Sequence, residues 1–167
     1  MPGLTVKVVL DDIKKIETEA LVVGFFQDVR PLKGAAGQLD WLLCGTLSGL
    51  LLENKLQGAL GDVALLTSRG KVPAKKIFLV GLGPKADFSA LSLRRAVKTA
   101  ITSVLGTGVT NAAVEYFRTP GEPAEKSLAA FREEVIAGLA ERSFAVSVLA
   151  PDREAYEQLS RFVTNGG

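Results

Sequence analysis

Glycines at the end of an apolar run form the first pattern with a chemical use. In "KKIFLVGLGPKADFS", residues 75–89, Gly81, Gly83 and Ala86 fit G-x-G-x-x-A, a spacing that lets backbone approach a dinucleotide pyrophosphate. Such a site needs a helix directly after the glycines, because the free amides of its first turn hold the phosphate. Here the helical pattern starts only at residues 89–92. We therefore favour a strand-ending turn in which the glycines serve backbone geometry.

A second glycine pattern lies in "RPLKGAAGQLD", residues 30–40. Gly34 and Gly37 directly precede the first turn of a leucine-striped helix, where free amides and the helix dipole favour an anion. A flexible connection that enters a core helix explains the same residues. The segment is therefore either an anion-binding loop or a plain connection.

Other residues with catalytic potential are few. Asp11 and Asp12 are adjacent, but neighbours in sequence usually point apart, so a solvated turn or cap is favoured over a carboxylate pair. Cys44 lies beside an apolar helical stripe, and we expect it to pack there as an inert thiol. The chain contains no histidine, which excludes Ser-His-Asp and Cys-His catalysis and His-ligated zinc. We expect no enzyme activity, metal or cofactor.

Composition favours one soluble, cytoplasmic domain. The chain has 167 residues, 47% of them hydrophobic and 23% charged, which suffices for one sizeable core. Its 20 basic and 18 acidic residues give a net charge of +2, so nucleic acid is a disfavoured partner. The basic residues at 75–76 and 94–98 predict a solvated helix face. The apolar stretch at 41–52 is shorter than the ~20 residues that cross a bilayer.

Hydrophobic periodicity predicts the elements that must position these residues. Six apolar runs predict strands at residues 4–10, 20–26, 62–67, 75–81, 112–117 and 144–150. Several are apolar on both faces, as in a sheet covered by helices on each side. Helical stripes cover residues 39–51, 97–105, 128–139 and 156–163, and Asp152 is the expected N-cap of the last. Residues 1–163 therefore form one α/β domain, and 164–167 are expected to be a tail.

The order and the amino-acid sequences of these segments resemble those of a known family. The runs "ETEALVVGFFQD", "LDWLLCGTLSGLLLENKLQGALGDVALL" and "KVPAKKIFLVGLGPKADFS", then "LRRAVKTAI", are similar to the N-terminal domain of leucyl aminopeptidases, the cytosol aminopeptidase family. That family carries its two-zinc chemistry in a C-terminal domain with an Asn-Thr-Asp signature, which no part of this sequence matches. The resemblance implies the fold and no peptidase site in this chain.

The same domain is similar to macro domains, which bind ADP-ribose. The resemblance implies a three-layer α/β/α fold with a mixed, mostly parallel sheet of about six strands. It implies that Asp12 reads adenine, that Gly34 and Gly37 belong to the first phosphate loop, and that Thr119 and Gly121 in "RTPGEP" stand for the second. The paired asparagines of catalytic macro domains are replaced by "GFFQD", which argues against hydrolysis of ADP-ribose links.

Two functions follow as expectations. The first is an assembly or regulatory module, partnered by an aminopeptidase catalytic subunit or by copies of itself, which predicts apolar side chains left exposed once the core is filled. The second is a module for ADP-ribose or a similar nucleotide, which predicts a pocket at the carboxyl ends of the strands.

Overall fold

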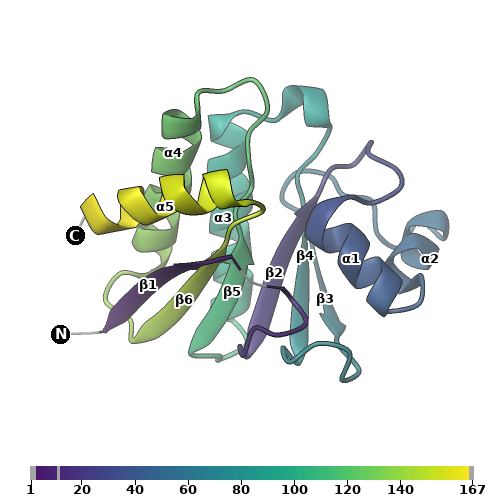
Figure 1. Cartoon of the computed structure of the whole chain (residues 1–167). Helices are drawn as coiled ribbons and strands as arrows, with labels where there is room; N and C mark the ends of the chain where they lie inside the picture. Colours follow the sequence, from purple (N-terminus) through teal and green to yellow (C-terminus); the bar gives the residue numbers. More distant parts are fainter. Residues whose placement is uncertain (1–2, 11, 166–167) are drawn as a thin grey trace.

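A six-stranded sheet forms the centre of the molecule (Figure 1). The computed structural model describes residues 3–10 and 12–165. The strand order is β1-β6-β5-β2-β4-β3, and only β3 runs antiparallel to its neighbour. The strands are β1 Leu4–Val9, β2 Ala20–Phe25, β3 Val63–Thr67, β4 Lys76–Gly81, β5 Asn111–Glu115 and β6 Phe144–Leu149. The predicted mixed, mostly parallel sheet is confirmed, and all six predicted strands form within two residues of their expected ends.

Helices cover the sheet on both faces, which confirms the predicted three layers. Side chains of α3 Ala90–Leu105, α4 Ala124–Leu139 and α5 Arg153–Asn165 pack in one core cluster. Those of α1 Gly34–Leu42 and α2 Thr46–Leu52 pack in the other. Every residue of β2 is buried, as its continuous apolar run indicated.

Two helices begin at a residue whose side chain caps the first turn. Ser89 precedes α3 and its hydroxyl accepts a hydrogen bond from the Ser92 amide at 3.3 Å. Asp152 precedes α5, and its carboxylate accepts from the Ala155 amide at 2.8 Å. Both contacts satisfy an amide of the first turn that has no partner within the helix. The predicted N-cap Asp152 is therefore confirmed, and the segment 82–89 separates the β4 glycines from α3.

The predicted helix over 39–51 is wrong in one respect, because it is broken at Leu43–Gly45. Gly45 has φ of +80° and the side chain of Asp40 accepts from the Ser48 amide at 2.9 Å, so a second helix starts there. Cys44 lies in this break with φ of +56° and is exposed. The expectation that Cys44 packs among the leucines is therefore wrong, since the break turns it away from the stripe.

α5 continues to Asn165, two residues into the segment expected to be a tail. Within the described residues, no helix taken singly has the length and apolarity to cross a membrane. Only α1 and α2 taken together reach that threshold, and they meet at a bend of 104°.

Replacing Asp152 by Ala is expected to lower the free energy of unfolding by about 1 kcal/mol, because the start of α5 loses its cap. Asp152→Asn keeps an acceptor oxygen and should retain most of that stability. Urea denaturation monitored by circular dichroism measures both variants. Equal losses in the two would assign the effect to the ion pair of Asp152 with Arg118 at 3.1 Å and not to the cap.

Candidate functional site

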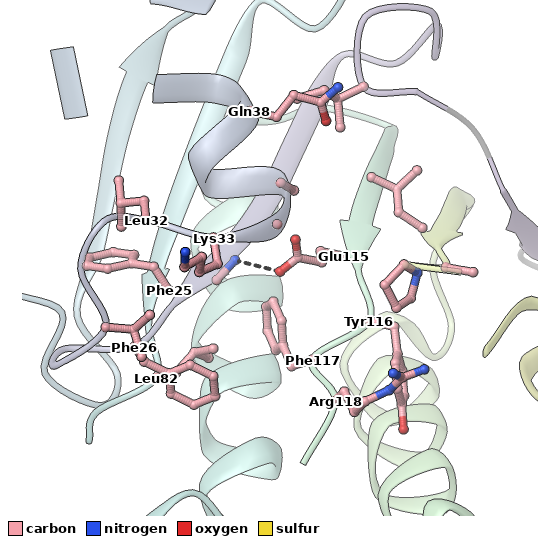
Figure 2. A pocket seen from close by; sticks show the side chains of 18 residues that line it. Phe25, Phe26, Leu32, Lys33, Gln38, Leu82, Glu115, Tyr116, Phe117 and Arg118 are labelled. Carbon is pink, nitrogen blue, oxygen red and sulfur yellow. Dashed lines mark hydrogen bonds between the residues drawn. The ribbon is translucent and has the colours of Figure 1, made fainter. Parts of the chain in front are cut away.

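A cavity of about 550 Å³ opens where β2, β5 and β6 end and α1 begins (Figure 2). The connections after β2 and β5 run to opposite sides of the sheet, and this is where open α/β sheets hold ligands. Its volume lies within the range of small-molecule pockets, roughly 300–1,000 Å³. The walls are largely apolar, and include Ile13, Phe25, Phe26, Leu32, Leu82, Phe117 and Leu149.

Glu115, the last residue of β5, places a carboxylate inside this cavity. One of its oxygens accepts from the Gly24 amide at 3.4 Å, drawn as a dashed line in Figure 2. The Ala35 amide, in the first turn of α1, is also near this carboxylate and favours its charged form. Burial raises the pKa of Glu115 to about 7, and the two amides lower it only in part. An acid of this chain thus lies beside an amide at the start of α1 that an anion would otherwise use.

Two cationic side chains line the cavity from its outer side. Lys33 and Arg118 are both exposed residues. Arg118 forms an ion pair with Asp152, whose nearer oxygen lies 3.1 Å from its guanidinium. Tyr116 lines the cavity as well, and burial raises the pKa of its phenol to about 12. Among the described residues that line the cavity, Glu115 is therefore the one interior charge.

The structure separates the two glycines expected in the first loop. Gly34 lines the cavity and has φ of +59°. Gly37 instead lines a second, shallow hollow of about 420 Å³ beside Trp41 and Cys44. A Cβ at Gly37 would collide with the carbonyl oxygen of Leu32, so close backbone packing accounts for this glycine.

Asp12 lies next to the cavity and contacts a residue that lines it. Its Oδ1 accepts from the Lys14 amide at 3.0 Å and from Gln38 Nε2 at 3.1 Å, and Gln38 lines the cavity. The first contact makes Asp12 a turn-forming residue, as the sequence favoured. Asp11, the other half of the proposed carboxylate pair, lies outside the described residues.

Thr119 and Gly121 are absent from the described residues that line the cavity. Thr119 is buried, and its hydroxyl oxygen has no hydrogen-bond partner within the described residues. Gly121 lies in the following turn with φ of +80°. Of the five residues expected to bind a ligand, only Gly34 faces the cavity, and a ligand-binding role for any of them stays a prediction.

The G-x-G pattern at residues 81–83 is a strand-ending turn, as expected. The amides of Gly81 and Gly83 donate to the carbonyls of Asp62 and Gly58, at 2.8 and 2.9 Å. Amides engaged in this way cannot also hold a pyrophosphate. A short turn of 3₁₀ helix, η1 Lys85–Asp87, and the capping residue Ser89 then intervene before α3.

Two candidates from the sequence remain, namely the basic face of α3 and a metal site. Arg94, part of the basic face of α3, pairs with Glu133 and Glu134 of α4 at 2.7 and 3.5 Å. The described residues contain no group of three His, Cys, Asp or Glu side chains that could hold a metal ion.

Sequence reasoning missed Glu115 as a site residue, although a signal was present. The run "AAVEYF" places one acid at the end of an otherwise apolar strand, and such an acid in a parallel sheet reaches the ligand-binding edge. Lys33 and Arg118 carry no comparable signal, because charged residues are common in loops.

Comparisons with known proteins agree on the type of domain. The sequence model of the cytosol aminopeptidase family, N-terminal domain, matches residues 22–147. A probable cytosol aminopeptidase of Geobacter sulfurreducens is 32% identical over 121 residues, which are 72% of this chain and 24% of that protein. The chain therefore spans about a quarter of the length of this relative, and the match covers no catalytic domain.

Two solved structures have the same fold. A mutant of tomato leucine aminopeptidase matches with a TM-score of 0.70 and 23% identity, over 99% of this chain and 37% of that one. The macrodomain of Oceanobacillus iheyensis, solved with ADP, matches with a TM-score of 0.72 and 15% identity, over 96% of this chain and 92% of that one. At these identities the likeness establishes the macro-like fold.

Proposed function

Because the chain belongs to the cytosol aminopeptidase family, whose N-terminal domain it matches over residues 22–147, we propose that it acts as a non-catalytic assembly or regulatory module. In this role it is one cytoplasmic domain over residues 1–163 that associates with an aminopeptidase catalytic domain. The names of the relatives, probable cytosol aminopeptidases, support that partner and compartment.

The observation that carries this proposal is an exposed tryptophan on α1. Trp41 is 78% exposed and borders the shallow hollow that Pro31, Leu32 and Cys44 also line. Tryptophan is one of the residues most enriched at the centre of protein interfaces, where the partner buries it. An exposed tryptophan beside a hollow is therefore typical of a surface that a partner covers. Trp41 supports the proposal, because an assembly module is expected to leave apolar side chains exposed.

Replacing Trp41 by Ser is expected to weaken binding to the catalytic partner at least about tenfold, because aromatic hot spots contribute about 2 kcal/mol or more. Sedimentation velocity of this chain mixed with a purified cytosol aminopeptidase from the same organism measures it. The matched control is Leu91→Ser, a leucine that is 79% exposed on α3, on the opposite face of the sheet. Failure of the unaltered chain to bind, or equal binding by both variants, would refute the proposal.

Nucleotide binding is the second candidate. The position and volume of the cavity favour it, and the Oceanobacillus iheyensis macrodomain has been solved with ADP. Glu115 opposes it, since a phosphate at the start of α1 would meet the carboxylate that lies near the Ala35 amide.

Titration calorimetry with ADP-ribose tests this candidate. We expect no heat at millimolar ligand, because the anion site is filled by Glu115. Saturable heat that Asp12→Ala removes would instead establish nucleotide binding in this cavity, with Asp12 as an adenine-reading acid.

A further inference from the structure

The cavity at the end of the sheet has the chemistry of a cation site with apolar walls. Its interior charge is the Glu115 carboxylate, and the walls around it include the aromatic rings of Phe25, Phe26 and Phe117 (Figure 2). The two cations that line it, Lys33 and Arg118, are on exposed residues. We propose that this cavity binds a small organic amine, with the ammonium group on Glu115 and an aromatic or aliphatic body against the phenylalanines.

Backbone amides face the carboxylate but leave room on it for a ligand. The Gly24 amide donates to Oε1 at 3.4 Å, and the Ala35 amide lies nearby in the first turn of α1. Two backbone amides leave further lone pairs on a carboxylate, which offers about four acceptor sites in all. An ammonium group can therefore bind without breaking either contact, and its charge-assisted hydrogen bond is of the stronger kind.

The surroundings select for a cation that also carries an apolar group. A carboxylate removed from water gains more from a bound cation than an exposed one does. Aromatic rings attract cations at their faces, and Phe25, Phe26 and Phe117 contribute such rings to the wall. A phosphate group at the start of α1 would instead be repelled by the Glu115 carboxylate.

Three probes of one shape test this inference by calorimetry: phenylpropylamine, phenylpropanol and phenylpropanoate. We expect the amine to bind at least about tenfold more tightly than the alcohol, the gain of one charged hydrogen bond, and the carboxylate probe to bind weakest. Binding should also shift the amide resonances of Gly24 and Ala35. Equal affinity of amine and alcohol, tighter binding of the anion, or no binding at millimolar concentration would each overturn the proposal.

Glu115→Gln should abolish the preference for the amine, because it keeps the shape and removes the charge. Glu157→Gln is the matched control, since it removes the same charge from an exposed residue on α5 and should leave the preference intact. If Glu115→Gln does not fold, the ratio of amine to alcohol affinity and the two amide shifts in the unaltered chain still decide the question.

Affinity for the amine should also rise with pH as Glu115 ionises around pH 7. The charged or titratable groups that line the cavity with Glu115 are Lys33 at the start of α1 and, after β5, Tyr116 and Arg118. Burial raises the pKa of the Tyr116 phenol to about 12, so this group stays neutral through that range. The inference is independent of the assembly proposal, because Trp41→Ser, which tests that proposal, changes no residue that lines this cavity.

Discussion

Glu115→Gln is expected to stabilise the protein at about pH 8 and to change its stability little at about pH 5. The pKa of this carboxyl rises from 4.5 to about 7 because folding buries it. Below 4.5 the group is protonated in both states and burial of its charge costs nothing. Above 7 the folded protein must hold a buried carboxylate, while the unfolded chain holds it in water. Stability from this group is therefore lost as the pH rises from about 4.5 to about 7.

The size of the effect follows from the same shift. A tenfold change in an equilibrium corresponds to about 1.4 kcal/mol, so a rise from 4.5 to about 7 amounts to roughly 3 kcal/mol at high pH. Glutamine carries no charge and avoids this penalty, and its carbonyl oxygen can still accept a hydrogen bond from the Gly24 amide. The full cost of the buried charge is therefore an upper bound for the gain in stability.

Thermal and urea unfolding at a series of pH values measure the prediction. The unaltered chain should lose stability from this group between about pH 4.5 and pH 7, and the Glu115→Gln profile should be flatter over that interval. Glu157→Gln, which removes an exposed charge, should follow the unaltered chain. Parallel profiles for all three proteins would mean that Glu115 is well solvated, and both the argument against a phosphate and the amine proposal would lose their basis.

Gly81→Ala is expected to destabilise the fold strongly, by roughly 1–3 kcal/mol or more. A Cβ at this position would lie 2.6 Å from the carbonyl carbon of Gly58 and even nearer to the carbonyl oxygen of Ala59. Both are backbone atoms, so no side chain can rotate to make room. The loop at residues 58–62 must move, and its hydrogen bonds with Gly81 would break.

Gly49→Ala is the matched control and should have the opposite sign. Gly49 lies within α2, and a Cβ there meets no atom within 4 Å. Alanine in a helix is about 0.5–1 kcal/mol more favourable than glycine, so this variant should be slightly more stable. Urea midpoints for the two variants measure the contrast. A stable Gly81→Ala protein would show that the glycine is not required by packing, and the phosphate-loop interpretation of G-x-G would regain support.

Local patterns predicted the elements because their signals are local. β2 was expected to be buried on both faces from its continuous apolar run, and all of its residues are buried. Helices were expected to start near residues 89–92 and at Asp152, and in each case a side-chain oxygen, of Ser89 or Asp152, accepts a hydrogen bond from a nearby amide. The break between α1 and α2 escaped prediction, since the leucine periodicity continues across it. It depends on the left-handed backbone at Cys44 and Gly45 and on the contact of Asp40 with Ser48.

The candidate site could not be predicted from local sequence patterns alone. The sequence by itself determined the layers, the strands, the absence of histidine chemistry and Gly34 as a residue at the start of α1. Only the tertiary structure decided that Glu115 meets α1, because Glu115 is distant in sequence from both Gly24 and Ala35. The desolvation that raises the pKa of Glu115 likewise arises from side chains of several elements. Charge and burial at a site depend on which segments meet there, and that is a property of the packed chain.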